Sequence, residues 1–372
     1  MFGEGGKSMF SNDSARQADA CRFCWMCRHI CPVAGSTGSE AWNPRSRGLM
    51  VSMIERGTEY NSEIAETMYH CTMCDACSND CVTGFKPTDF IREARMLAVV
   101  NDIAPKAIMK EIENILEKDN IFGAAVNEKF ALEAEKHSGN ADVMLFVGQA
   151  GRTVAADTAV NAMQLLDKAG VCYTVLKDEP ASGAYLGDLM GFVGDVQNAA
   201  VKAASAIKAA GTKKLVVLNP YDAVMFRDQY AKWNLLTDVE IVTISAFVAE
   251  LIAAGALKPG KAELKASLQE PIKLTRGLDE EKPLKDIIEA LGVDHVELFL
   301  HGKMSRCVGT AIIDGYAPEV AKAMVKTRLE DAARLGSSKI ITASPDDSYI
   351  MKKYVTDEFE IVDLFTLLNE NC

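Results

Sequence analysis

Two short cysteine runs near the N-terminus constrain this chain more than any other feature of its sequence. They read Cys21-x-x-Cys24-x-x-Cys27-x-x-x-Cys31-Pro32 and Cys71-x-x-Cys74-x-x-Cys77-x-x-x-Cys81. Together they hold eight of the eleven cysteines, at identical internal spacing. The spacing is typical of proteins in which three thiolates of a run bind one 4Fe-4S cubane and the fourth thiolate binds a second cubane.

The geometry of a cubane explains this spacing. Gaps of two residues let a winding backbone place three sulfurs at three corners of one cube, and the longer gap directs the last sulfur elsewhere. We therefore predict two 4Fe-4S clusters that exchange their fourth ligands between the runs. The predicted metal ligands are Cys21, Cys24, Cys27 and Cys81 for cluster 1, and Cys71, Cys74, Cys77 and Cys31 for cluster 2.

Two other uses of cysteine fit the pattern less well. A zinc site usually takes two Cys-x-x-Cys pairs, four ligands for each ion, and needs no third cysteine two residues further on. Disulfides need an oxidising compartment and usually a small secreted scaffold. The spacing therefore favours iron–sulfur clusters over both alternatives.

Length, charge and hydropathy limit the kinds of protein that this chain can be. A chain of 372 residues is long enough for two or three domains. Its formal net charge of −12 disfavours nucleic acid and anionic lipid as partners. The sequence has no apolar run long enough for a transmembrane helix, and residues 3–7 interrupt any signal-peptide core. We therefore expect a cytoplasmic protein without direct membrane insertion.

The pattern of apolar residues changes along the chain. After an expected N-terminal arm (residues 1–20), residues 21–104 have helical periodicity, for example from Phe90 to Leu97, and predict an α-helical domain. A helical connector is expected over residues 105–139. Strand-like runs then alternate with amphipathic helices, which is typical of a mainly parallel sheet covered by helices. The clearest runs are residues 143–147, 171–176, 215–218 and 239–244.

An internal repeat predicts two such α/β units. Residues 211–222 align with residues 336–347, and each copy follows an Ala-rich helical segment and precedes a second strand and helix. We place the boundary near Pro259, which gives units at residues 140–258 and 259–372. The expected fold class is thus multidomain, an α-helical domain followed by two α/β repeats.

Together these features resemble a family of iron–sulfur subunits. That family includes the heterodisulfide reductase C and D subunits, the C subunit of anaerobic glycerol-3-phosphate dehydrogenase and the iron–sulfur subunit of glycolate oxidase. The specific match covers both cysteine runs and the Pro44-Arg45 and Arg47-Gly48 segment between them. The resemblance implies an α-helical dicluster ferredoxin domain at the N-terminus and a pair of cysteine-rich repeats in the remainder.

The C-terminal units depart from the family pattern, in which Cys-Cys-Gly and Cys-Pro-x-Cys motifs hold a catalytic non-cubane cluster. The corresponding stretches here are Ala181-Ser182-Gly183, Asn219-Pro220-Tyr221-Asp222, Cys307-Val308-Gly309 and Ser344-Pro345-Asp346-Asp347. One thiol cannot hold a cluster that needs several, so the resemblance implies degenerate repeats that keep the fold without the metal. Asn219 and Ser344, each followed by proline, instead favour helix N-caps.

The remaining cysteines and the residues beside the runs have structural or tuning interpretations. Cys172 lies in an apolar run and is predicted to be buried. Cys307 is interpreted as a vestigial family cysteine, with a reactive low-pKa thiol as the alternative, and Cys372 as a free surface thiol. Six residues beside the runs are candidates for tuning the clusters. His29 and His70 could donate hydrogen bonds to sulfur, and Trp25 and Met26 could shield a cluster from water. Arg45 and Arg47 either place positive charge near a cluster or a partner, or are solvated surface residues.

Two cubanes without a substrate site beside them predict an electron-transfer subunit. The sequence has no dinucleotide-binding glycine motif, Walker loop or Ser/His/Asp set, so we expect neither a flavin or nicotinamide site nor a catalytic residue. The expected role is to relay single electrons, within a cytoplasmic redox complex, between a flavoprotein dehydrogenase or electron-bifurcating flavoenzyme and ferredoxin or another carrier. A catalytic reductase that uses the C-terminal repeats and a non-redox scaffold are the alternatives.

Overall fold

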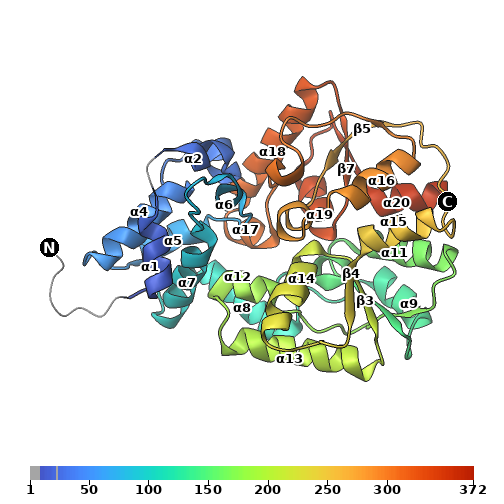
Figure 1. Ribbon diagram of the computed structural model, residues 1–372, viewed down its shortest axis with the longest axis horizontal. Coiled ribbons are helices and arrows are strands. Elements are labelled where there is room, and N and C mark those ends of the chain that lie inside the picture. Colours follow the sequence, from blue (N-terminus) through green and yellow to red (C-terminus); the bar gives the residue numbers. More distant parts are fainter. Residues whose placement is uncertain (1–8, 22–23) are drawn as a thin grey trace.

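The computed structural model describes residues 9–21 and 24–372, and its architecture combines an all-helical part with two α/β units (Figure 1). Helices α1–α7 lie at the left of Figure 1, and the two α/β units lie at the right, one below the other. Each unit is built on a four-stranded parallel sheet. The expected fold class is therefore confirmed at the level of mixed α and α/β structure.

The N-terminal part is helical throughout its described residues. Its helices are α1 (Asn12–Asp19), α2 (Met26–Ile30), α3 (Pro32–Thr37), α4 (Pro44–Glu55), α5 (Ser62–Tyr69), α6 (Ala76–Asp80) and α7 (Pro87–Val100). Proline opens α3, α4 and α7 at a position where no N–H is needed. The side chain of Asn43 caps α4 by accepting a hydrogen bond from the Ser46 N–H at 2.9 Å.

The start of the chain differs from the expected arm of residues 1–20. Its described part contains α1, which the Ser11 side chain caps and which packs on α4 and α7. Phe10 and Ala18 are buried in the same core as these helices. Two apolar side chains are too few to produce a periodic pattern, so the polar composition of this segment concealed the helix. Residues 1–8 of the expected arm lie outside the described residues.

The connector and the first α/β unit follow. Two connector helices, α8 (Lys106–Lys118) and α9 (Glu128–Lys136), lead into a sheet of order β2-β1-β3-β4. Its strands are β1 (Val143–Phe146), β2 (Tyr173–Thr174), β3 (Lys214–Val217) and β4 (Glu240–Thr243). Its helices are α10 (Gly148–Arg152), α11 (Ala156–Lys168), α12 (Ala184–Met190), α13 (Gly194–Ala209), α14 (Pro220–Met225) and α15 (Ile244–Ala253), with a π-helical turn η1 (Phe226–Tyr230) after α14.

The second unit has the corresponding strand order, β6-β5-β7-β8. Its strands are β5 (Lys265–Gln269), β6 (Asp294–His295), β7 (Lys339–Thr342) and β8 (Glu360–Asp363). Its helices are α16 (Lys282–Ala290), α17 (Ala311–Tyr316), α18 (Pro318–Arg334), α19 (Pro345–Tyr354) and α20 (Leu364–Asn371), with a π-helical turn η2 (Lys273–Gly277) and a 3-10 turn η3 (Gly302–Met304). The expected strands are present, although the run at 171–176 forms only the two residues of β2.

The predicted N-caps are confirmed in both units. Asn219 caps α14 by accepting a hydrogen bond from the Tyr221 N–H at 3.1 Å, and Ser344 caps α19 through the Asp347 N–H at 3.2 Å. Proline follows each cap at the first helical position. The two positions therefore begin equivalent helices at the carboxyl ends of β3 and β7.

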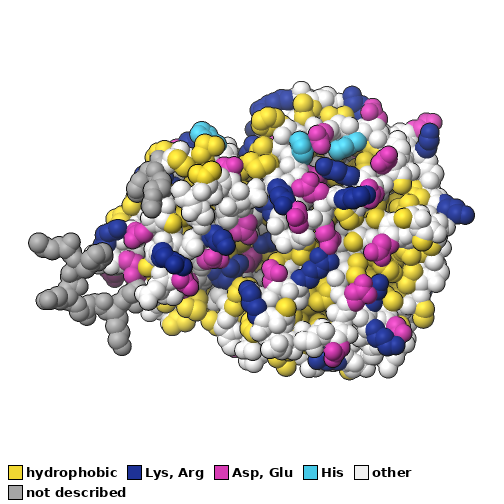
Figure 2. All heavy atoms as spheres, viewed as in Figure 1, with side chains coloured by type: hydrophobic (Ala, Val, Ile, Leu, Met, Phe, Trp, Pro, Cys, Tyr) yellow, Lys and Arg dark blue, Asp and Glu magenta, His cyan; other side chains and the backbone are white. Residues whose placement is uncertain are grey.

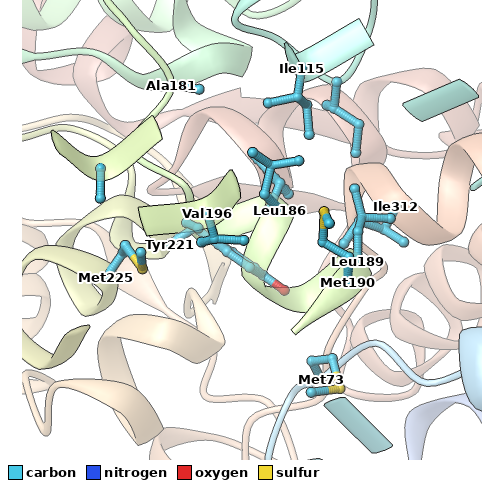
Figure 3. Close-up of a cluster of buried hydrophobic side chains, with 14 of the residues drawn as sticks. Met73, Ile115, Ala181, Leu186, Leu189, Met190, Val196, Tyr221, Met225 and Ile312 are labelled. Atoms are coloured by element: carbon cyan, nitrogen blue, oxygen red, sulfur yellow. The ribbon is translucent and has the colours of Figure 1, made fainter. Parts of the chain in front are cut away.

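A continuous apolar core joins the N-terminal helices to the first α/β unit. One cluster of buried side chains contains Met73, from the loop of the second cysteine run, together with Leu189 and Met190 of α12 and Ile312 of α17. Figure 3 shows Leu189, Met190 and Ile312 together, with Met73 below them. Buried polar groups reinforce this contact, since the Tyr69 hydroxyl donates to the Leu189 carbonyl at 3.1 Å. Among the helices of the described residues, none combines the length and apolar character needed to cross a bilayer.

Candidate iron–sulfur centre

The two cysteine runs adopt the same local structure. In each run the residue after the second cysteine has a left-handed backbone, with φ of 66° at Trp25 and 58° at Asp75. A five-residue helix, α2 or α6, then carries the third cysteine and ends at the fourth, Cys31 or Cys81. The helices α2 and α6 pack against each other. Equal spacing in the sequence thus produces two copies of one cysteine-bearing turn, placed side by side.

The four predicted ligands of cluster 2 converge on one cavity. Cys31, Cys71, Cys74 and Cys77 all line it, and its remaining wall is largely apolar, with Pro32, Val33, Pro44, Pro87 and Ile91. Cys31, Cys74 and Cys77 are buried. Burial, followed by the proximity of Cys74 and Cys71, raises the pKa of Cys77 well above that of a free thiol. Several thiols in a shared apolar cavity fit a multinuclear cationic centre, because their thiolates need compensating positive charge there.

The predicted ligands of cluster 1 lie closer to the surface. Cys24 is exposed, and Cys21, Cys27 and Cys81 are partly buried. Burial and the neighbouring Cys21 and Cys31 raise the pKa of Cys27 to about 12, with a smaller contribution from Cys24. The loop after Cys81 reaches the first run, since the Thr83 hydroxyl donates to the Ala20 carbonyl at 3.5 Å. The first three ligands are therefore neighbours, and the fourth lies on an adjoining loop.

The segment between the runs supplies charge and hydrogen bonds to the sulfurs. Arg47 on α4 is only 1% exposed and donates from Nε to the Thr67 carbonyl at 2.9 Å. Burial raises the pKa of Cys31 to about 11, and the charge of Arg47 opposes that rise. The backbone N–H of Arg45 donates to Cys27. Of the two sequence interpretations of Arg47, the structure thus excludes a solvated surface residue.

Three other tuning candidates differ from the predictions. His70 stacks on Trp42 with ring centroids 3.9 Å apart, and its Nδ1 atom lies 2.9 Å from the Glu66 carbonyl, so this nitrogen contacts a backbone carbonyl and not a sulfur. Trp25 and Met26 are 41% and 55% exposed and therefore shield the first run poorly. The exposed face of Trp25 instead receives the Arg45 guanidinium, 4.1 Å from the ring centroid.

Side chains of the second α/β unit hold the loop of the second cysteine run. The Lys273 ammonium donates to the Met73 carbonyl at 2.8 Å, and Arg276 Nε donates to the Cys74 carbonyl at 2.7 Å. Cys307 is buried beside Cys74, and the hydrogen bond between their sulfurs lowers the pKa of Cys74 and raises that of Cys307. The sequence analysis singled out Cys307 but not its contact with Cys74, because only the fold brings residues so far apart in sequence together.

The stretches at residues 181–183, 219–222 and 344–347 contribute to a buried polar network at the contact of the two α/β units. The Ser182 hydroxyl donates to Asp222, while Asp346 accepts hydrogen bonds from Tyr185 at 2.5 Å and from Asn219 at 3.1 Å. Asp346 of the second unit thus holds two side chains of the first unit, Tyr185 and Asn219. Outside this network, Cys372 is exposed as predicted. The prediction of a buried Cys172 is wrong, because this thiol lies just before the short β2 strand and is exposed.

Comparisons with known proteins agree with this geometry at the N-terminus. Residues 17–85 match the family model of the 4Fe-4S dicluster domain. The match supports iron–sulfur clusters in this part of the chain. A domain of this kind is consistent with two clusters.

Two curated relatives extend over most of the chain. A "Probable membrane-anchored ferredoxin" of Chromohalobacter salexigens is 23% identical over 336 residues, which cover 78% of this chain and 49% of the relative. A "Probable iron-sulfur-binding oxidoreductase FadF" of Bacillus subtilis is 21% identical over 370 residues, covering 83% and 52%. The chain thus spans about half the length of these relatives. Both names place them among iron–sulfur proteins.

One solved structure has the same overall fold. It is the crystal structure of a hypothetical protein from Helicobacter pylori, which aligns with a TM-score of 0.52 at 12% identity. The alignment covers 97% of this chain and 73% of the other. The likeness includes both the helical part and the α/β units, and it concerns the fold alone.

Proposed function

We propose that this chain is an iron–sulfur electron-transfer subunit of a multisubunit redox complex. The observation that carries the proposal is the convergence of Cys31, Cys71, Cys74 and Cys77 on one cavity, within a segment that matches a dicluster domain. In the proposed subunit, these four thiolates hold cluster 2, and the thiolates of Cys21, Cys24, Cys27 and Cys81 hold cluster 1. The clusters supply one-electron redox capacity when bound.

The residues of the chain set the conditions for that chemistry. The apolar wall of the cluster 2 cavity excludes water, and the buried Arg47 adds positive charge near Cys31. Both influence the cost of adding an electron to a thiolate-bound cluster. Cluster 2 in this scheme is insulated, whereas the exposed Cys24 gives cluster 1 an edge that a partner can approach.

The partner of cluster 1 is, in this proposal, a flavoprotein dehydrogenase or an electron-bifurcating flavoenzyme. Exposed apolar side chains support docking beside the first run, namely Trp25, Met26 and, at 95% exposure, Val82. Figure 2 shows hydrophobic side chains gathered over this end of the molecule. Ferredoxin or another carrier takes part as the second partner, and the many free thiols favour the cytoplasm.

The proposal also places the chain with the heterodisulfide reductase C/D-like subunits, as a member with degenerate repeats. The identical strand order of the two sheets supports an origin by repetition. The hydrogen bonds of Asp222 and Asp346 support the replacement of a family metal site by a structural network. Residues 140–258 and 259–372 then serve as a docking platform and as support for the N-terminal domain.

A catalytic reductase is the second candidate, and the position of Cys307 favours it. Its thiol contacts Cys74, so a substrate disulfide bound there would meet a thiol beside a cluster ligand. Isolated chain that turns over a disulfide substrate, with activity lost in C307S, would support this candidate over the electron-transfer subunit.

Iron analysis tests the electron-transfer proposal. Chain purified without oxygen should contain about eight iron atoms, and dithionite should reduce both clusters to paramagnetic states seen by electron paramagnetic resonance. The C77A variant should keep about four iron atoms, because it removes one ligand of cluster 2 alone. The C372A variant, which removes an exposed cysteine outside the runs, should match wild type. Zinc in place of iron, or clusters that resist reduction, would contradict the proposal.

A further inference from the structure

A large cavity lies where the N-terminal helices meet both α/β units. Its volume is about 470 Å³, within the range of small-molecule sites. Its wall is formed by α6, α7, α12, α14 and the π-helical turns η1 and η2. Figure 2 shows basic and acidic side chains side by side at this junction, between the left lobe and the α/β units. No predicted cluster ligand lines this cavity, so it is distinct from the candidate iron–sulfur centre.

Both π-helical turns of the described chain border this cavity. Asp228 and Gln229 belong to η1, and Lys273 and Arg276 belong to η2. Such turns are rare and occur frequently at functional sites, because the widened backbone redirects side chains. In η2 the turn directs both basic side chains towards the N-terminal domain, where they bond the Met73 and Cys74 carbonyls.

The inner wall carries more positive than negative charge. Asp188 is buried, and it is shared by Arg92, at 3.0 Å, and Lys273, at 3.8 Å. Although burial acts in the opposite direction, these two cations hold the pKa of Asp188 below its usual value. Arg276 forms no ion pair among the described residues, because its Nε and Nη1 atoms donate to backbone carbonyls, including Ser305 at 2.6 Å. Two cations therefore share the buried carboxylate of Asp188, and Arg276 adds a third positive charge without a carboxylate of its own. Over the whole lining, five cations face four carboxylates, in a chain whose net charge is negative: Lys86 and Lys232 join the three cations, and Asp75, Asp89 and Asp228 join Asp188.

Guanidinium groups in this wall also have unused hydrogen-bond donors. The Nε atom of Arg92 and the Nη2 atom of Arg276 are buried and have no hydrogen-bond partner within the described residues. Buried donors are normally satisfied, and a guanidinium N–H edge suits a planar carboxylate. Apolar side chains lie close by, since Phe192, Val224 and Met225 line the same cavity. The wall thus offers a cationic part and an apolar part.

We propose that this cavity binds a small organic acid. Its carboxylate pairs with the cationic set of Arg92, Lys273 and Arg276, and its carbon skeleton contacts Phe192, Val224 and Met225. A carboxylate satisfies the unused donors and balances the excess charge, which a neutral or cationic ligand does not. The mixed wall favours an organic acid over a fully hydrated inorganic anion.

Because the cavity borders the second cysteine run, a bound ligand also affects the proposed cluster 2. Asp75, Ser78 and Asn79 line the cavity, and they lie in the second cysteine run between Cys74 and Cys81. An anion bound there adds negative charge beside the proposed cluster 2, which disfavours reduction and lowers the reduction potential of that cluster. This coupling rests on the proposed electron-transfer function, whereas the binding of the acid does not.

Isothermal titration calorimetry of the full chain with succinate tests the binding. Succinate should bind, and succinamide, its uncharged analogue of similar shape, should not. The K273Q variant should weaken succinate binding at least tenfold, and K208Q, which removes an exposed charge on α13, should leave it unchanged. V224F should also weaken binding by filling the cavity without a change of charge. Equal binding by K273Q, or tighter binding of inorganic phosphate than of succinate, would overturn the proposal.

Unchanged far-ultraviolet circular dichroism and iron content show that each variant is folded. A redox titration then tests the coupling: succinate should lower the potential of one cluster in wild type and K208Q, with no shift in K273Q. Succinate binding without any shift would overturn the coupling and leave the binding site established. A chain without clusters would overturn the proposed function, while calorimetry would still decide whether the cavity binds the acid.

Discussion

At the scale of single residues, the candidate centre depends on how positive charge is placed around sulfur. Buried thiols such as Cys31 and Cys77 have raised pKa values because the protein interior disfavours their thiolates. Arg47 is buried with them and forms no ion pair among the described residues, and its Nη2 atom has no hydrogen-bond partner there. Its charge is therefore left to act on the sulfurs of the cluster 2 cavity, which it also lines.

Replacing Arg47 should change the potential of one cluster. In R47M the proposed cluster 2 loses a buried positive charge, so its reduction potential should fall by roughly 60 mV, the equivalent of a tenfold change in a one-electron equilibrium. R47K keeps the charge and should remain near wild type. R334M removes an exposed arginine of α18 and serves as the control. A redox titration followed by electron paramagnetic resonance makes the measurement, and equal potentials in R47M and R334M would contradict the role of Arg47.

Buried carboxyls give a second prediction at this scale. Burial is the main cause that raises the pKa of Asp222 to about 8; Glu179 and Asp346 add to it, and Ser182 and Arg152 oppose it. The folded chain therefore holds a proton that the unfolded chain releases above the ordinary aspartate pKa. Stability from this group is present at low pH and is lost as pH rises towards about 8, at most about 1.4 kcal/mol per pH unit.

The D222N variant removes this titration. Its free energy of unfolding in urea should fall less steeply than that of wild type between about pH 5 and pH 8. D286N, at an exposed aspartate of α16, controls for the loss of a negative charge and should keep the wild-type slope. Parallel curves for D222N and wild type would show that Asp222 ionises normally in the folded chain.

At the scale of elements, the sequence predicted those features that depend on residues close together in the chain. The spacing of each cysteine run predicted a repeated turn, and Asn219-Pro220 and Ser344-Pro345 predicted helix starts, because both features depend on residues a few positions apart. The left-handed backbone at Trp25 and Asp75 was not predicted, since Trp rarely adopts it and Asp adopts it only in a minority of cases. Such turns bring three cysteines of a run towards one cluster. The sequence shows this requirement only as the spacing of the cysteines.

Elements held by distant contacts were harder to predict. The helix α1 is stabilised by packing on α4 and α7 rather than by its own composition, which is why it was taken for an arm. Cys172 lies in an apolar run that supplies only a two-residue strand, so the run did not imply burial. Both errors arise where tertiary packing overrides local pattern.

The caps allow a prediction for a single element. Asn219 caps α14 and also donates to Asp346 at 3.1 Å, whereas Asn61 caps α5 through the Ile64 N–H at 3.1 Å. N61A should cost about 1 kcal/mol, the usual value of a cap. N219A should cost about 2 kcal/mol or more, because it also leaves a buried carboxyl without one donor. Urea unfolding of both variants measures the difference, and equal costs would mean that the bond to Asp346 contributes nothing.

At the scale of the whole molecule, the N-terminal domain is attached through backbone carbonyls of its own cluster loop. Lys273 and Arg276 reach the Met73 and Cys74 carbonyls from the second α/β unit. Arg95 on α7 reaches the Cys71 carbonyl, at the start of the same loop, and the Asp188 carbonyl of α12 at 2.6 Å, and so joins the loop to α12. These partners are far apart in the sequence, so no local sequence pattern predicted their contacts. The loop that carries three proposed ligands of cluster 2 is thus positioned by the rest of the chain.

This arrangement predicts that loosening one contact separates the stability of cluster 2 from that of the α/β units. R276L removes the hydrogen bonds from Arg276 to the Cys74 and Ser305 carbonyls, which are worth about 1.5–3 kcal/mol each when made by a charged donor. On heating, half of the visible absorbance of the clusters should therefore disappear before the far-ultraviolet circular dichroism of the α/β units changes. Wild type should lose both signals together.

R227L is the matched control for this experiment. Arg227 pairs with Glu280 at 2.5 Å and donates to the Ile241 carbonyl, so its loss loosens the contact between the two α/β units without touching the cysteine loop. R227L should lower the unfolding temperature seen by circular dichroism and keep the two signals together. Early loss of absorbance in R227L as well would mean that cluster 2 depends on the stability of the whole α/β part, and that the Arg276 contact has no special share in holding the loop.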